Sequence, residues 1–206
     1  MQLVLASQSP ARLAVLRAAG VEPVVRVSGV DEDAIAAALP DATPAAVVAA
    51  LAEAKARAVA ATDVPPDAVI VGCDSMLFHN GQLVGKPGTP ERARERWASM
   101  AGGTGELLTG HALLRLTDGR ITATAVGTET TTVRFGKPTD AELDAYLATE
   151  EPLSVAGAFT LDGYGGWFVD GIEGDPSSVI GISLPLTRRL LTELGVSVVD
   201  VWNRTR

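Results

Sequence analysis

The chain has 206 residues, of which 47% are hydrophobic and 20% are charged, and its formal net charge is -8. This length can bury the core of one large domain, or of one domain with two lobes. The negative charge disfavours nucleic acids and anionic membranes as main partners, although a small anionic ligand can bind where basic residues gather. No apolar run approaches the ~18 residues of a membrane span, and we expect no signal peptide. Cys73 is the single cysteine, which excludes an internal disulfide and predicts a cytoplasmic location.

Near its start, the sequence predicts a short strand, a small polar turn and a helix. Ser9 suits the N-cap position and Pro10 the first helical position. A helix start presents free backbone N–H groups, and together with Ser7, Ser9 and Arg12 it would suit a phosphate. An ordinary capped strand–loop–helix unit explains the same residues, and the segment alone slightly favours this plainer interpretation.

The rest of the chain alternates between apolar strands and helical patterns. Strands are predicted at residues 3–6, 24–27, 68–72, 107–116, 121–135, 166–172 and 196–201. Helices are predicted at residues 11–19, 34–38, 45–61, 91–100, 140–149 and 186–194, and prolines or capping residues lie at several starts. Asn80-Gly81 and Asp118-Gly119 are hairpin turn signals. This order predicts an α/β fold with a mixed sheet, in which the hairpin-rich centre forms a second lobe.

Asp74 is the first candidate for chemistry, because it follows a buried apolar run that ends at Cys73. Ligands of α/β sheets bind at the carboxyl ends of the strands, so a carboxylate there is well placed. A turn-capping aspartate is the alternative. The neighbouring Gly72 and Ser75 favour the functional interpretation.

A compact acidic group, Asp31, Glu32 and Asp33, follows the second predicted strand. Carboxylates suit a hard divalent cation such as Mg²⁺ or Mn²⁺. A helix N-terminus that carries acidic residues explains the group equally simply, because negative charge there is favourable.

Two lysines lie in informative surroundings. Lys55 shares one helical face with apolar residues such as Val48 and Leu51, so it either extends to water or reaches into a site. Lys86 lies in Gly85-Lys86-Pro87, which lacks the spacing and the Ser or Thr of a phosphate-binding P-loop. It can still hold an anion as a point charge.

The histidines and the cysteine give weaker signals. His79, beside a predicted turn, is expected to be exposed and without function, and His111 to be structural. Neither has the neighbours of a zinc site. Cys73 is expected to be a buried small residue.

Seven motifs in order resemble those of the Maf-type nucleoside triphosphate pyrophosphatases, over essentially the full length. They are Leu5-Ala6-Ser7-Gln8-Ser9-Pro10-Ala11-Arg12, Val30-Asp31-Glu32, Leu51-Ala52-Glu53-Ala54-Lys55-Ala56, Gly72-Cys73-Asp74-Ser75, Gly85-Lys86-Pro87, Thr109-Gly110, and a late signature that runs from Ala156-Gly157-Ala158-Phe159 through Ile172-Glu173-Gly174 to Gly181-Ile182. Each motif alone is weak, but seven in order at suitable spacing are strong.

The resemblance implies a single Maf-like domain over residues 1–206. Its fold would be the two-lobed α/β fold of Maf and ITPase proteins, a mixed twisted sheet flanked by helices with an active-site cleft between the lobes. The implied reaction is hydrolysis of a nucleoside triphosphate between the α- and β-phosphorus atoms, which releases a monophosphate and pyrophosphate. Relatives often form homodimers, and the oligomeric state of this chain is left open.

The resemblance also implies roles for individual residues. Asp74 would be the proton acceptor for the attacking water, and Glu32 and Lys55 would complete the catalytic group. Asp74 and Glu32 would hold Mg²⁺ or Mn²⁺, which lowers the pKa of bound water. The substrate would be bound by Ser7, Ser9, Arg12, Lys86 and Asp162.

Departures from the family pattern bear on the substrate. Ala11 replaces the first arginine of the usual pair, and Gly105 stands where many relatives place histidine or glutamine. Asp162 stands where pyrimidine-preferring relatives often carry glutamine. A carboxylate can accept from N3–H of thymine or uracil, and also from N1–H and the amino group of guanine. Preference for dTTP and UTP is favoured, with the 7-methyl-GTP subgroup as an alternative.

A different class of function is also open. The family is linked with septum formation, so the chain could be a nucleotide-sensing regulator of cell division without significant turnover. Intact Asp74, Glu32 and Lys55 favour the enzyme. A phosphatase that releases single phosphates would differ in its products.

Overall fold

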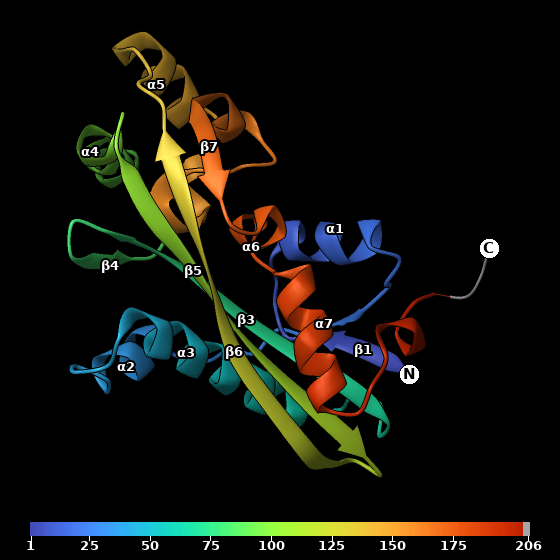
Figure 1. The fold of residues 1–206 in the computed structure, drawn as a ribbon. Coiled ribbons are helices and arrows are strands. Elements are labelled where there is room, and N and C mark those ends of the chain that lie inside the picture. Colours follow the sequence, from blue (N-terminus) through green and yellow to red (C-terminus); the bar gives the residue numbers. More distant parts are fainter. Residues whose placement is uncertain (204–206) are drawn as a thin grey trace. The chain divides into compact units, whose positions relative to one another are not determined.

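A computed structural model describes residues 1–203 of the chain (Figure 1). These residues form two compact units, each assembled from separate stretches of sequence. Unit 1 comprises Met1–Asp74, Thr109–Glu129 and the described residues from Gly181 onward, and unit 2 comprises Ser75–Leu108 and Thr130–Ile180. The helices of the described residues are all too short or too polar to cross a membrane.

The strands join into a mixed α/β sheet, as the sequence predicts. Its order is β2-β1-β3-β5-β6-β7, and β4 pairs with β3. The pairs β1–β2 and β1–β3 are parallel, whereas β3–β4 and β6–β7 are antiparallel. The strands are β1 (Gln2–Leu5), β2 (Val24–Val25), β3 (Ala68–His79), β4 (Gln82–Val84), β5 (Thr104–Thr117), β6 (Arg120–Phe135) and β7 (Val169–Glu173).

Helices cover the sheet and connect its strands (Figure 1). The α-helices are α1 (Pro10–Ala18), α2 (Glu32–Ala37), α3 (Pro44–Ala60), α4 (Pro90–Met100), α5 (Asp140–Ala148), α6 (Pro176–Ile180) and α7 (Leu184–Glu193). Four 3₁₀ helices follow the same chain order, η1 (Glu151–Ser154), η2 (Ala156–Ala158), η3 (Tyr164–Phe168) and η4 (Val198–Asp200).

Unit 1 has three layers, because alternate residues of its strands face opposite helices. On one face, Val69, Val71 and Cys73 of β3 pack with Leu16 of α1 and with leucines of α7. On the other face, residues 68 and 70 of the same strand pack against α3. Asp74 continues this second series, so the alternation directs its side chain toward α3.

Two glycines let α3 approach the sheet closely. A Cβ atom at Gly72 of β3 would lie 2.2 Å from the carbonyl oxygen of Ala52 and 2.9 Å from the nitrogen of Ala56. A Cβ atom at Gly110 of β5 would lie 2.1 Å from the carbonyl oxygen of Val48. Any larger residue would push the helix away from the strands, so these glycines fix the depth at which α3 and Lys55 lie.

Unit 2 has a separate core, built around Trp97 of α4. The indole stands edge-on to Phe135, Tyr146 and Phe168, with ring centroids 5.9–6.2 Å apart. Its Nε1 donates to the carbonyl oxygen of Ala158 at 2.8 Å. This aromatic cluster holds α4 and α5 together with the 3₁₀ segments that follow them.

The predicted hairpins are confirmed, and their turns explain why Gly was needed. Asn80 and Gly81 have φ angles of 49° and 75°, and Asp118 and Gly119 have 51° and 73°. Two consecutive positive φ angles are typical of the two-residue turns that join antiparallel strands. These turns connect β3 with β4 and β5 with β6.

Three predicted strands differ substantially from the structure. The strand predicted at residues 68–72 continues to His79, so Asp74 lies within β3 and does not follow its end. Residues 196–201 contain η4 instead, because Ser197 caps Val199 while the Asp200 carboxylate accepts from the Ser197 N–H at 3.2 Å. Such local side-chain bonds compete with strand pairing. The strand predicted at residues 166–172 is shortened to β7, since the glycine-rich residues before it form η3.

We predict that Gly72→Ala lowers the free energy of unfolding by about 1–3 kcal/mol, because the new methyl group overlaps the backbone of α3. Urea unfolding measures this change. Gly85→Ala is the matched control: the nearest atom to its Cβ would be Met76 Cε at 3.7 Å, and a change of about 0.5 kcal/mol or less is expected. Equal effects of the two substitutions would contradict the close approach of α3 as the cause.

Candidate functional site

The first group of candidate residues centres on a buried ion pair. The Nζ atom of Lys55 lies 2.6 Å from Oδ1 of Asp74, and the two residues are 7% and 6% exposed. Lys55 lies on the buried face of α3, where the sequence placed it beside Val48 and Leu51. The sequence allowed Lys55 either to extend to water or to reach into a site, and in the structure its amine reaches the Asp74 carboxylate.

Glu32 joins the same lysine from the start of α2. Its Oε1 lies 2.8 Å from Lys55 Nζ, although the Glu32 side chain remains 51% exposed. Asp31 caps this helix by accepting from the Ala34 N–H at 2.9 Å, and Asp33 lies in the first turn. Both interpretations of the acidic group therefore apply: its residues stabilise the N-terminus of α2, and Glu32 also supplies one carboxylate to the site.

The Glu32 and Asp74 carboxylates, which both contact the Lys55 ammonium, are the kind of ligand that a divalent cation prefers. Mg²⁺ is commonly held by one or two carboxylates together with substrate phosphates, and Glu32 and Asp74 supply that number. Residues 1–203 contain no group of three or more His, Cys, Asp and Glu that could hold a metal ion. Among the described residues, Glu32 and Asp74 are therefore the two neighbouring carboxylates that could hold such a cation.

The second group lies at the start of α1. Arg12 donates from Nη1 to Ser7 Oγ at 3.1 Å and from Nε to the carbonyl oxygen of Gly181 at 2.8 Å. Ser9 caps the helix by accepting from the Arg12 N–H, as the sequence predicts. The Ser7 hydroxyl also accepts from the Ser9 N–H at 3.1 Å. These bonds orient the guanidinium beside two hydroxyls and a helix N-terminus.

The β1–β3 pairing places Ser7 and Asp74 beyond the same end of the parallel pair. Leu5 is paired with Val71 in parallel register, and the Ala6 N–H donates to the Val71 carbonyl oxygen at 2.9 Å. Ser7 therefore lies just after the carboxyl end of β1, and Asp74 lies three residues past Val71 within β3, which continues beyond β1 to His79. This edge is where ligands of parallel α/β sheets bind.

Lys86 lies in unit 2, in the loop between β4 and α4, and it is exposed. The loop is held by its own neighbours. The Gly85 carbonyl oxygen accepts from the Gly157 N–H at 3.2 Å and from Arg96 Nη1, and the Gly88 N–H donates to the Leu153 carbonyl oxygen at 3.0 Å. Burial, together with nearby Arg92, lowers the pKa of Arg96. No pattern in the sequence indicates this role of Arg96.

Asp162 also belongs to unit 2, where it is exposed in the segment before η3. The structure thus brings Asp74, Lys55 and Glu32 into one group and Ser7, Ser9 and Arg12 into another. Lys86 and Asp162 are carried by two loops of unit 2.

The weaker signals have mixed outcomes. His79 is partly buried, not fully exposed as predicted, and its ring lies between two backbone carbonyl oxygens: Nδ1 is 2.9 Å from that of Thr104, and Nε2 is 3.1 Å from that of Ser99. His111 is structural as predicted, since it is fully buried and its Nε2 accepts from the Ser183 N–H at 2.8 Å. Burial raises the pKa of the Cys73 thiol to about 11, which fits an inert core residue.

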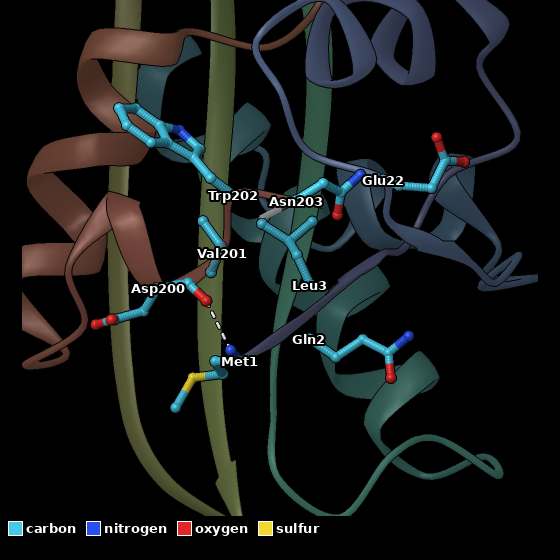
Figure 2. Close-up of a pocket in the computed structure, with 8 residues that line it drawn as sticks. All are labelled: Met1, Gln2, Leu3, Glu22, Asp200, Val201, Trp202 and Asn203. Carbon is cyan, nitrogen blue, oxygen red and sulfur yellow. Dashed lines mark hydrogen bonds between the residues drawn. The ribbon is translucent and has the colours of Figure 1, made fainter. Parts of the chain in front are cut away.

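A surface pocket of about 600 Å³ lies elsewhere in unit 1 (Figure 2). It adjoins the start of β1, where the Met1 amino group donates to the Asp200 carbonyl oxygen at 2.6 Å, and Trp202 lines its side. None of the predicted site residues lines it. It is also at the amino end of β1, opposite the edge where ligands of parallel sheets bind.

Comparison with known proteins identifies close relatives. The family described as Maf-like protein matches residues 2–194. A protein of Saccharopolyspora erythraea named nucleoside triphosphate pyrophosphatase is 64% identical over 98% of this chain and 97% of its own length. Proteins of the same name from Nocardia farcinica and Mycolicibacterium gilvum are 67% and 58% identical, over 97% and 98% of this chain and 96% and 99% of their own lengths.

We predict that Lys55→Met lowers the free energy of unfolding by about 3–5 kcal/mol, because it leaves the Asp74 carboxylate buried without its partner. Urea unfolding measures the loss, and adding Asp74→Asn should restore part of it, as a double-mutant cycle would show. Arg57→Met is the control on the same helix: Arg57 is half-exposed and pairs with Glu53 at the surface, so it should lose less than about 1 kcal/mol. Independent, additive effects of the Lys55 and Asp74 substitutions would contradict the pairing.

Proposed function

This chain belongs to the Maf family, and we propose that it hydrolyses nucleoside triphosphates between the α- and β-phosphorus atoms. The products are a nucleoside monophosphate and pyrophosphate, and the activity clears unwanted nucleotides from the cytoplasmic pool. The observation that carries the proposal is the buried Lys55–Asp74 pair with Glu32 beside it. Its relatives' shared name supports the same reaction.

Asp74 is the proposed proton acceptor. The oxygen of a water molecule attacks the phosphorus atom on one side of the anhydride bond between the α- and β-phosphates. This bond breaks, the phosphate group on its other side leaves, and the proton from water passes to the Asp74 carboxylate. The ion pair supports this role because Lys55 holds one carboxylate oxygen, Oδ1, at 2.6 Å and so fixes the orientation of the group. Fixed orientation of the reacting groups is a major source of catalysis.

Lys55 and Glu32 complete the proposed catalytic group. Lys55 positions Asp74 and brings a positive charge to a site that otherwise holds carboxylates. Glu32 is the more exposed of the two acids, so its oxygens remain accessible to a ligand from solvent.

The phosphates are assigned to basic and hydroxyl groups. Arg12, Ser7 and Ser9 surround the start of α1, where the positive end of the helix dipole favours an anion. A helix dipole and a guanidinium that is already oriented need little rearrangement to bind phosphate oxygens. Lys86 adds a positive charge from its exposed loop in unit 2.

We propose Mg²⁺ or Mn²⁺ as the cofactor, held by Glu32 and Asp74. The two carboxylates outnumber the single ammonium of Lys55, so this group carries net negative charge and attracts a cation before it attracts a phosphate. A bound divalent ion neutralises phosphate charge and lowers the pKa of coordinated water.

For the base we propose a preference for dTTP and UTP. Asp162 is exposed in unit 2, and its carboxylate is the proposed acceptor for N3–H of thymine or uracil. Cytosine has no N3–H to donate, so a carboxylate at this position distinguishes thymine and uracil from cytosine.

We predict that the wild-type protein, supplied with Mg²⁺ or Mn²⁺, converts a nucleoside triphosphate into monophosphate and pyrophosphate in equal amounts. Product chromatography together with a pyrophosphate assay measures both. Asp74→Asn keeps the shape of the side chain but removes its basicity, and should lower kcat by about 10²–10⁴-fold. A chelator should abolish turnover, and Mg²⁺ or Mn²⁺ should restore it.

The outcomes of this experiment separate the possible functions. Inorganic phosphate and diphosphate as products would indicate a phosphatase. Nucleotide binding without turnover by the wild-type protein would replace the enzyme with a nucleotide-sensing regulator. Glu53→Gln, a change on the exposed side of α3, is the control and should turn over as the wild type does.

A second prediction concerns the base. The value of kcat/KM for dTTP and UTP should exceed that for dCTP and CTP by about tenfold or more, as expected when a buried or bound partner is left without its hydrogen bond. Asp162→Ala should reduce this ratio mainly by lowering kcat/KM for dTTP and UTP. A higher kcat/KM for 7-methyl-GTP than for any pyrimidine would contradict the proposed preference and assign the chain to the other subgroup.

A further inference from the structure

The segment of residues 160–165 in unit 2 is wrapped around one carboxylate, that of Glu151. Glu151 Oε1 accepts from the Thr160 hydroxyl at 2.5 Å and from the Gly165 N–H at 3.1 Å. Its Oε2 accepts from the Tyr164 N–H at 3.1 Å. One side chain of η1 therefore binds both ends of the segment that carries Asp162.

The segment packs closely at two glycines, against the Glu151 carboxylate at Gly163 and against Tyr146 and Thr160 at Gly165. A Cβ atom at Gly163 would lie 2.4 Å from Glu151 Oε2. A Cβ atom at Gly165 would lie 2.4 Å from the Tyr146 hydroxyl and 2.6 Å from the Thr160 nitrogen. The absence of side chains at these two glycines therefore permits the close packing of the segment.

The charge on Glu151 is stabilised by this arrangement. Burial by itself raises the pKa of the carboxyl group, but the hydrogen bonds from Thr160, Tyr164 and Gly165 outweigh it and lower the pKa below its ordinary value. The group is thus ionised at neutral pH. Hydrogen bonds to a charged acceptor are stronger than those between neutral groups, so they hold the segment firmly.

The same 3₁₀ helix also holds the loop of Lys86. The Leu153 carbonyl oxygen, two residues after Glu151, accepts from the Gly88 N–H at 3.0 Å. Within unit 2, η1 is therefore bonded to both loops that carry a proposed substrate contact. The Asp162 side chain itself is exposed, so its position depends on how the backbone around it is held.

We propose that Glu151 is the positioning residue for Asp162 and thereby sets the base discrimination of the enzyme. This inference rests on the proposed function. In this role Glu151 fixes the backbone of residues 160–165 before the nucleotide arrives, through its hydrogen bonds with Thr160, Tyr164 and Gly165. A preorganised segment pays less conformational entropy on binding, so its loss appears in KM and in the choice of base.

The test compares Glu151→Gln with Glu150→Gln in the full chain. Glu150 is the exposed neighbouring acid, so its substitution makes the same chemical change without touching the segment. NMR hydrogen exchange of the ligand-free protein measures the Tyr164 and Gly165 amides. In Glu151→Gln these amides should exchange about tenfold faster, because a neutral amide oxygen replaces a charged acceptor. In Glu150→Gln they should exchange as in the wild type.

Kinetics provides the second measurement. Glu151→Gln should raise KM for dTTP by about tenfold, lower the preference for dTTP over dCTP, and leave kcat within about twofold. Thr160→Val keeps the volume and removes the donor to Glu151, but it also removes a direct acceptor of the Gly165 N–H, so the Tyr164 amide is its readout. The exchange rate of this amide and KM should move in the same direction by a smaller amount. Thr160→Val decides the question by itself if Glu151→Gln does not fold.

Three results would overturn the inference. Unchanged exchange of the two amides would show that Glu151 does not hold the segment. A fall in kcat with unchanged KM would assign Glu151 to the chemical step, and an unchanged preference for dTTP would separate it from base choice. Absence of hydrolysis by the wild type would refute the proposed function alone, since the exchange rates still decide whether Glu151 positions the segment.

Discussion

The buried ion pair of Lys55 and Asp74 is the constraint on which unit 1 depends. A charge buried in a protein interior is strongly unfavourable without a partner, so neither residue is tolerated at this depth alone. The ammonium must therefore arrive at the carboxylate, and α3 must lie close to β3 and β5 for that to happen. Gly72 and Gly110 provide the space, because the backbone of α3 occupies the volume that a Cβ atom at either position would fill. Packing and chemistry thus require the same arrangement: the glycines that seat the helix also set the distance between the two charged groups.

Charge is distributed locally in a way that the net charge of -8 conceals. The group of Glu32, Lys55 and Asp74 is negative as a whole, whereas the start of α1 combines the Arg12 guanidinium with a helix N-terminus. One region therefore favours a cation and the other an anion. A metal–triphosphate complex presents both, so the proposed substrate agrees with an acidic protein that has a local basic group.

The buried ion pair lies in unit 1, whereas unit 2 is held together by an aromatic core and by charged side chains that bind its loops. Its core is aromatic, with Trp97 edge-on to three other rings, and its chain between α5 and β7 consists largely of short 3₁₀ segments. Short segments of this kind satisfy few of their own backbone groups, so side chains must supply the partners. Glu151 and Arg96 do so for the two loops that carry Asp162 and Lys86. Rigidity there comes from a few charged side chains, and single substitutions should consequently have local effects.

The sequence by itself determined much of the local structure and the identity of the family. Apolar periodicity placed most strands and helices, Asn-Gly and Asp-Gly placed both hairpins, and Lys55 was recognised on an apolar helical face because these signals depend on neighbours within a few residues. It failed at residues 196–201, where Ser197 and Asp200 form a local cap that overrides strand propensity. Only the tertiary structure decided that Lys55 bonds Asp74 and Glu32, and that Glu151 holds residues 160–165. Those contacts join different elements, and their geometry follows from how closely helices and loops pack, which no local pattern of residues encodes.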